Sequence, residues 1–256
     1  MSIRAGFVPA MDRYPTDAWA MRLAFVSCIQ KTVLMIDPPT SFHRPDPLGI
    51  ELAQHLSRAI VFGEYPPGSK LVEEVIGARY GISRSPIRDA FRHLEGQGLI
   101  VYEARRGVRV TAMSRKDLDE VYACRLPLET LAAMGAARSA DPASVVALRT
   151  ALTTMEEAHG LGSPERYFLE NVDFTRALHR ASANDTLIRL LAGLSHQALR
   201  YRYVAYQRFP DLMTRSVEGN RDLFRAVAAG DADRARLVTE DLIGHSWKQL
   251  QGCFGG

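Results

Sequence analysis

The 256-residue sequence has little of several features that define common classes of protein. It has three cysteines, Cys28, Cys124 and Cys253, which lie far apart and form no CxxC pair. An odd number of separated cysteines predicts neither a disulfide framework nor a thiolate metal site, and it favours a reducing, cytoplasmic location. The net charge is only +3, so any binding of nucleic acid must depend on a local cluster of basic residues.

Long uncharged apolar runs are also missing. The apolar stretch over residues 18–36 is interrupted by Arg22 and Lys31, so it is not expected to cross a bilayer. The basic, apolar and small-residue parts of a secretory signal peptide do not follow one another in order. The sequence therefore predicts neither a membrane protein nor an exported one.

The first part of the chain carries the weakest pattern. Residues 1–46 are expected to form an N-terminal extension, either an amphipathic arm that packs on the body or a flexible tail. Met35 lies just before a linker-like stretch, PPTSFHRPDPLG. A native start at that methionine would exclude residues 1–34, and the sequence leaves this alternative open.

Motifs of common catalytic sites are missing as well. The sequence contains no GxSxG, no P-loop, no HExxH and no dinucleotide-binding fingerprint. We therefore expect no enzyme activity and no cofactor.

Residues 71–111 show a more specific pattern. Leu71, Val75 and Ile76 predict the apolar face of a short helix. Gly81 follows at the position where a helix often ends in a left-handed residue. This is the first half of a helix-turn-helix.

A second helix is predicted to begin near Ser83, which is a typical N-cap residue. Its apolar positions recur at helical spacing and are Ile87, Ala90, Phe91 and Leu94. Residues 99–101 and 108–110 then predict two paired strands, with residues 104–107 as the tip between them. The order of these elements is that of a winged helix-turn-helix.

The other side of the second helix is basic. Three arginines spaced by four line it, and they are Arg84, Arg88 and Arg92. Arginine binds guanine edges or phosphates, and Ser83 and Ser85 at the helix N-terminus suit phosphate contacts. Arg105 and Arg106 lie at the tip of the predicted wing. A solvated basic helix beside an ordinary hairpin is the simpler alternative, but the ordered combination favours DNA binding.

The segment from about Leu48 to Met113 resembles the DNA-binding domain of the GntR family of bacterial transcriptional regulators. The resemblance rests on the motifs PPGSKL, YGISRSPIRDAFRHLEGQGLI and RRGVRV. It implies that the second helix enters the major groove of operator DNA and that the wing tip reaches the minor groove. The residues implied to contact DNA are Ser83, Arg84, Ser85, Arg88, Arg106 and Gly107.

After Thr111 the pattern is almost entirely helical. Helices are predicted over residues 114–138, 141–159, 164–182, 185–207, 211–229 and 231–250. We therefore expect a mainly α fold, with a winged helix-turn-helix over residues 47–113 and an all-α bundle of about six to seven helices over residues 114–256.

The helical half resembles the C-terminal effector-binding domain, the FCD domain, of the FadR-like subfamily of GntR regulators. The motifs that carry the resemblance are YACRLPLETLAAMGAA, NVDFTRALHRASAND and EGNRDLFRAVAAGDADRARLV. The resemblance implies that the bundle forms a homodimer and binds a small effector such as a carboxylate. We therefore expect a transcriptional regulator, more specifically a repressor. The effector is expected to modulate its affinity for operator DNA.

In the metal-binding members of that subfamily, an Asp or Asn and three His residues hold a divalent ion. The aligned positions here are Asn171, Thr175, Asn220 and about Leu242. Threonine and leucine do not replace two imidazoles as ligands for zinc or nickel. The resemblance therefore implies a pocket of hydrogen-bonding groups instead of a metal site.

Arg125 occupies the position at which relatives place an arginine that faces the pocket. A guanidinium group binds a carboxylate through two parallel hydrogen bonds. The alternative is a salt bridge to Glu129, one helical turn later. The predicted effector-binding residues are Arg125, Asn171, Thr175 and Asn220.

Three further interpretations concern the same half of the chain. A shifted metal site that uses His179 and His245 is one alternative, and an architectural DNA binder without an effector is another. A run of alternating arginines and tyrosines over residues 200–208 scatters around its helix, so it does not suit base stacking. We interpret this run as pocket wall and subunit surface.

Overall fold

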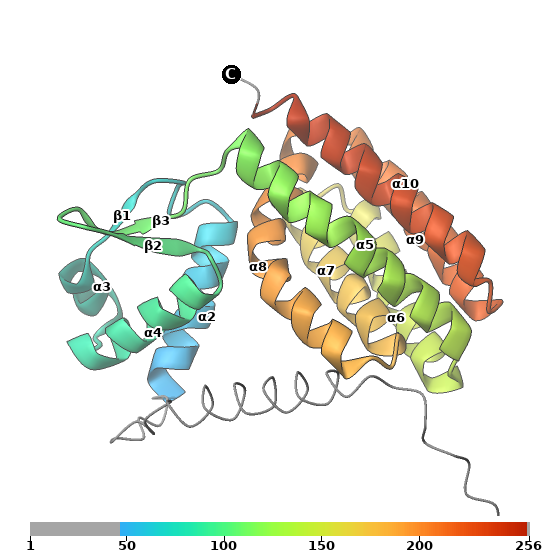
Figure 1. The fold of residues 1–256 in the computed structure, drawn as a ribbon, viewed down its shortest axis with the longest axis horizontal. Helices are drawn as coiled ribbons and strands as arrows, with labels where there is room; N and C mark the ends of the chain where they lie inside the picture. Colours follow the sequence, from blue (N-terminus) through green and yellow to red (C-terminus); the bar gives the residue numbers. More distant parts are fainter. Residues whose placement is uncertain (1–46, 255–256) are drawn as a thin grey trace, which may run out of the picture. The chain divides into compact units, whose positions relative to one another are not determined.

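The computed structural model of the chain describes residues 47–254, so the expectations for residues 1–46 lie outside the described range. Within that range the fold is mainly α, with nine helices and one three-stranded sheet. The predicted fold class is confirmed, because a winged helix-turn-helix precedes an all-helical bundle (Figure 1). None of the helices in this range is long and apolar enough to span a membrane.

The winged-helix domain comprises six elements. They are α2 (Pro47–Val61), β1 (Lys70–Leu71), α3 (Glu73–Tyr80), α4 (Arg84–Gly96), β2 (Ile100–Glu103) and β3 (Gly107–Val110). The strands form an antiparallel sheet in the order β1-β3-β2. Helix α2 packs along α4, and the apolar residues predicted for the second helix are buried there, which confirms its core-facing side.

The turn between α3 and α4 has the predicted form. Gly81 ends α3 with φ of 67°, in the left-handed region that a residue with a Cβ rarely adopts. Ser83 takes the N-cap position of α4 in an extended conformation. The glycine turn therefore sets the direction in which α4 leaves the turn.

The structure corrects the prediction for the first helix. Leu71 lies in β1, where it pairs with Val108, and not in a helix. Val75 is 63% exposed, so of the three apolar residues only Ile76 is a buried part of α3. The wing is accordingly three-stranded and not two-stranded, because the chain before α3 adds a short strand that buries Leu71.

The helical bundle comprises α5 (Arg115–Ser139), α6 (Pro142–Gly160), α7 (Pro164–Ala181), α8 (Asp185–Arg208), α9 (Asp211–Ala228) and α10 (Ala232–Gln251). These helices match the predicted ranges closely. Five of them begin at a residue whose side chain accepts a hydrogen bond from a backbone N–H of the first turn, and these caps are Ser114, Asp141, Ser163, Asn184 and Asp231. Capping of this kind fixes where a helix starts.

The bundle packs its helices side by side around one apolar core. Helix α5 lies along α10, and α6 lies along α7 (Figure 1). The largest fully buried side chains in this core are aromatic, and they include Tyr122, Tyr167, Phe168, Phe174 and Tyr201. The polar groups within such a core must find partners inside the protein, and this requirement shapes the site described next.

Candidate functional site

Helix α4 presents its basic side to solvent. Arg84 and Arg88 are exposed, as are Ser83 and Ser85 at the start of the helix. The hydroxyl of Ser83 makes no capping hydrogen bond, so it remains available to another acceptor or donor. The four predicted DNA-contacting residues of this segment therefore lie together at the N-terminal end of α4.

The exposed arginines of α4 pair with carboxylates on the preceding helix. Arg84 Nη2 lies 3.2 Å from a carboxylate oxygen of Glu74, and Arg88 Nε lies 3.1 Å from one of Glu73. Surface pairs of this kind contribute only about 0–1 kcal/mol, because water and salt screen them. Little free energy is therefore lost if a DNA phosphate or base edge replaces Glu74 and Glu73 as the partners of Arg84 and Arg88.

The wing tip joins β2 to β3. Arg106 is exposed there, and Gly107 has φ of 82°, which favours glycine at the point where β3 begins. Arg109 has a different role, because its guanidinium group donates to the carbonyl of Gly68 at 2.8 Å and pairs with Glu103. The structure thus places Arg106 and Gly107 at a tip that a folded hairpin holds.

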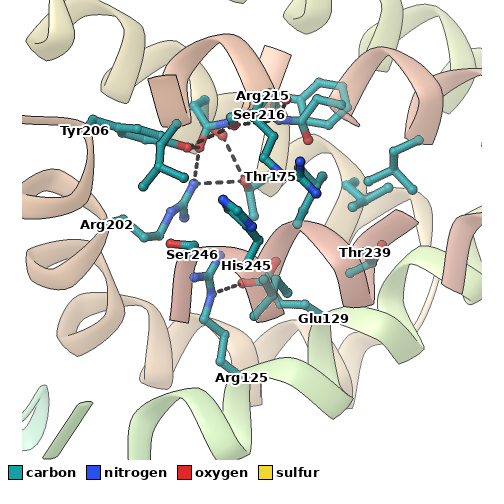
Figure 2. Close-up of a pocket in the computed structure, with 18 residues that line it drawn as sticks. Arg125, Glu129, Thr175, Arg202, Tyr206, Arg215, Ser216, Thr239, His245 and Ser246 are labelled. Carbon is teal, nitrogen blue, oxygen red and sulfur yellow. Dashed lines mark hydrogen bonds and ion pairs between the residues drawn. The ribbon is translucent and has the colours of Figure 1, made fainter. Parts of the chain in front are cut away.

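The bundle contains a pocket of about 70 Å³ between α5, α7, α8, α9 and α10. All four residues predicted to bind an effector line it, although they come from three helices. Figure 2 labels two of them, Arg125 and Thr175. The lining also includes Glu129, Arg202, Tyr206, Arg215, Ser216, Leu242, His245 and Ser246. The fold thus brings together positions that were identified from separate segments of the sequence.

Arg125 lines the pocket and also forms a salt bridge with Glu129. Its Nε donates to Glu129 Oε1 at 2.6 Å, and both side chains are buried. Burial opposes both charges, but the attraction between them is stronger, so the pKa of Arg125 is raised and the pKa of Glu129 is lowered. His179 Nε2 lies 3.6 Å from the other oxygen of Glu129. The salt bridge that the sequence offered as the alternative is therefore present, and it is buried in the pocket wall.

Arg202 lines the pocket, although the sequence pattern assigned it only to the pocket wall and not to the effector-binding residues. Its side chain is buried, and Nη2 donates to Asn171 Oδ1 and, at 3.2 Å, to Thr175 Oγ1. Burial, reinforced by the nearby charge of Arg125, lowers the pKa of Arg202. Within residues 47–254, no carboxylate lies within ion-pair distance of its guanidinium group.

A sequence signal for Arg202 did exist. The apolar residues Leu187, Leu191, Ala198 and Ala205 are buried and follow one side of α8 at helical spacing. Arg202 lies on the same side, one turn after Ala198. A charged residue on an otherwise apolar stripe is a candidate for a functional site, because burial of a charge is costly.

Neutral polar groups complete the pocket wall. Tyr206 donates to Asn171 Oδ1 at 3.2 Å and shares a hydrogen bond of 3.0 Å with Ser216 Oγ. Asn220 Nδ2 donates to the carbonyl of Ser216 at 2.8 Å, and the hydroxyl of Thr175 donates to the carbonyl of Asn171 at 2.8 Å. These groups satisfy one another and hold Asn171 in place beside Arg202.

This donor set does not fit a divalent ion. The side-chain oxygens of Asn171 and Thr175 already accept hydrogen bonds from a cationic guanidinium group, and Leu242 offers no donor atom. His245 lines the pocket and His179 contacts Glu129, yet residues 47–254 contain no cluster of three or more His, Cys, Asp or Glu side chains that could hold a metal ion. A positive charge therefore lies beside Asn171 and Thr175, two of the positions that the resemblance aligns with metal ligands.

Comparison with known proteins identifies both halves of the chain. The family model for bacterial regulatory proteins of the gntR family matches residues 49–110, and the model for the FCD domain matches residues 120–245. The chain belongs to the GntR family. It is a DNA-binding transcriptional regulator with a C-terminal FCD domain, and it is not an enzyme.

Relatives with curated descriptions agree with this assignment. The regulator is 34% identical over 149 residues to an uncharacterized HTH-type transcriptional regulator, YdhC, of Bacillus subtilis, an alignment that covers 58% of this chain and 66% of YdhC. It is 29% identical over 176 residues to a probable D-xylose utilization operon transcriptional repressor of Paenarthrobacter nicotinovorans, with 69% of this chain and 76% of that protein covered.

A solved structure shows the same fold. McbR/YncC of E. coli matches with a TM-score of 0.72 at 20% identity, covering 82% of this chain and 100% of that one. At this level of identity the likeness concerns the fold, and it says nothing about the ligand.

Proposed function

We propose that the protein is a homodimeric repressor whose affinity for operator DNA changes when a small organic acid binds in the bundle pocket. The observation that carries the proposal is the pocket itself, which gathers the buried side chains of Arg125, Asn171 and Asn220 and the half-buried side chain of Thr175. A concave site with a few convergent polar groups is typical of small-molecule recognition. The proposed location is the cytoplasm.

The proposed DNA contacts follow from the exposed basic residues of the winged-helix domain. Ser83, Arg84, Ser85 and Arg88 would contact the major groove, and Arg106 with Gly107 would approach the minor groove. The support for the first set is their common position at the N-terminal end of α4 and the weak, exposed ion pairs of the two arginines.

A route from the pocket to the DNA-binding domain is part of the proposal. Helix α8 contributes Arg202 to the pocket, and two residues earlier Arg200 donates to the backbone carbonyl of Thr111 at 2.7 Å. The ring of Tyr203, next to Arg202, lies 4.8 Å from the ring of Phe62 directly after α2. A shift of α8 on ligand binding would therefore be transmitted to both ends of the winged-helix domain.

The direction of regulation and the homodimeric state are proposed on separate grounds. The relative from Paenarthrobacter nicotinovorans is named as a repressor, which supports repression here. A homodimer is proposed because two recognition helices are needed to read a two-fold operator.

The experiment has two stages with the full-length protein. Selection from random duplexes defines the operator, and fluorescence anisotropy then measures operator affinity with and without each of a panel of small organic acids. We expect at least one acid to change the Kd by about 5–150-fold, the usual range of allosteric coupling. An operator affinity that no acid in the panel changes would indicate an architectural DNA binder and would overturn the proposal.

A further inference from the structure

Arg202 differs from the other arginines of the pocket in its charge partners. Three arginines line the pocket, and two of them have carboxylate partners. Arg125 pairs with buried Glu129 at 2.6 Å, and Arg215 pairs with exposed Asp241 at 2.7 Å. Among the described residues, the guanidinium of Arg202 has only neutral acceptors, those of Asn171 and Thr175. The pocket therefore holds one buried positive charge in excess.

An excess buried charge is unfavourable unless a partner compensates it. The charge of Glu129 attracts Arg202, but burial and the repulsion from Arg125 outweigh that attraction, so the pKa of Arg202 is lowered. An anion that enters the pocket would pair with Arg202 and restore neutrality. In Figure 2 the side chain of Arg202 extends into the pocket, as does that of His245.

We propose that Arg202, and not Arg125, binds the acid group of the effector, and that the effector is a small monocarboxylate. Arg125 then acts as a positioning residue, since its pair with Glu129 fixes the part of the pocket wall that α5 contributes. This inference rests on the proposed function, because it assumes that the pocket is the effector site. It assigns binding of the acid group to Arg202 instead of Arg125, the residue that the sequence favoured.

The size of the cavity limits the ligand. A volume of about 70 Å³ holds roughly five to seven water-sized groups. Acetate, pyruvate and L-lactate fit within this limit, whereas citrate is about twice as large. One excess positive charge also matches a monoanion better than inorganic phosphate, which is partly dianionic near neutral pH.

Binding is tested by titration calorimetry of the full-length protein with acetate, pyruvate, L-lactate, lactamide, inorganic phosphate and citrate. We expect saturable binding of at least one small monocarboxylate. Lactamide, which has the shape of lactate without its charge, should not bind, and phosphate and citrate should bind more weakly. Tighter binding of lactamide than of lactate, or of citrate than of every monocarboxylate, would overturn the assignment of the ligand class.

The anchor is tested with Arg202→Gln, Arg202→Lys and Arg125→Gln. We expect Arg202→Gln to weaken binding of the best monocarboxylate about 10- to 100-fold, as for loss of a charged hydrogen-bond partner, and Arg202→Lys to weaken it less. Arg189→Gln is the matched control, because Arg189 lies exposed on the same helix and, among residues 47–254, its side chain bonds to Thr186 and not to a pocket residue. Its affinity should equal that of the parent.

Melting temperatures distinguish a residue that binds the ligand from one that stabilises the fold. Without ligand, Arg202→Gln should melt at or above the parent temperature, because it removes an unpaired buried charge, whereas Arg125→Gln should melt lower. A lower melting temperature for Arg202→Gln with unchanged acid binding, or a loss of binding in Arg125→Gln alone, would overturn the inference and leave the proposed function standing. Acid binding through Arg202 without any change in operator affinity would instead contradict the proposed function alone.

Discussion

The partners of a buried charged side chain decide its role. Arg125 and Arg202 line the same pocket, but only Arg125 has a carboxylate within 2.6 Å. The two guanidinium groups are therefore not equivalent, although the sequence alone does not show that Arg202 lacks a carboxylate partner. The pairing of Arg125 with Glu129 depends on residues one helical turn apart, whereas the contacts of Arg202 with Asn171 and Thr175 join α8 to α7.

The arginines of α4 provide a first prediction at this scale. If Arg84 and Arg88 bind base edges, replacing either with alanine should weaken operator binding by about 1–3 kcal/mol and relax base preference at one position per half-site. Anisotropy titrations against operator variants check this. Arg189→Ala is the control on a bundle helix, and operator binding by both α4 variants at the parent affinity would rule out α4 as the recognition helix.

The buried pair gives a second prediction. Glu129→Gln leaves Arg125 without its partner, so the free energy of unfolding should fall by about 3–5 kcal/mol at neutral pH. Because Arg125 holds the pKa of Glu129 well below its unfolded value, the pair stabilises the native state fully above that unfolded value, about pH 4.3.

That contribution is lost as the pH falls toward the lowered pKa of the folded state. The difference in urea-unfolding free energy between the parent and Glu129→Gln should therefore shrink from pH 7 to pH 3. A difference that stays constant over this range would mean that the ionised carboxylate does not stabilise the fold.

At the scale of helices and strands, the sequence predicted the bundle well because its helices carry clear start signals. Ser114 and Asp141 cap α5 and α6 at the positions expected from the sequence, and Gly230 separates α9 from α10 with φ of 72°. The short elements were harder. Helix α3 has only eight residues with one buried apolar side chain, and β1 has two residues, so neither carries a periodic pattern of its own.

The pocket residues, too, were predicted from the sequence only in part. Asn171, Thr175, Asn220 and Arg125 were found from the sequence because a family motif placed them, and they do line one cavity. Arg202 was assigned only to a pocket wall, because its importance depends on which carboxylates lie near it. That information is tertiary, and no spacing along one helix contains it.

Helix α8 gives a third prediction, since it touches both the pocket and the winged-helix domain. Arg200→Gln removes the hydrogen bond to the carbonyl of Thr111 but leaves the pocket side of α8 intact. We expect acid binding to remain within about twofold of the parent, while the acid-dependent change in operator Kd decreases. Calorimetry and anisotropy on the same samples measure the two quantities.

Arg189→Gln is again the control, because it changes the charge of α8 without a contact to either site. If Arg200→Gln responds to the acid as the parent does, α8 does not carry the coupling through Thr111.

The molecule as a whole gives a fourth prediction. A single winged helix reads a short site with limited specificity, so the regulator should bind its operator as a dimer with two half-sites. Light scattering after size-exclusion chromatography should give twice the mass of the 28.4 kDa chain at micromolar concentration. A monomer under these conditions, both free and on operator DNA, would contradict the dimeric arrangement.

The central claim is that a small acid, bound by the pocket, changes operator affinity. The most direct measurement is the operator Kd of the full-length parent and of Arg202→Gln, with and without a saturating concentration of the best-binding monocarboxylate. We expect the acid to change the operator Kd by about 5–150-fold in the parent and much less in the variant, with equal affinities for both proteins in the absence of acid. The same Kd for the parent with and without the acid, at a concentration where calorimetry shows the pocket to be occupied, would contradict it.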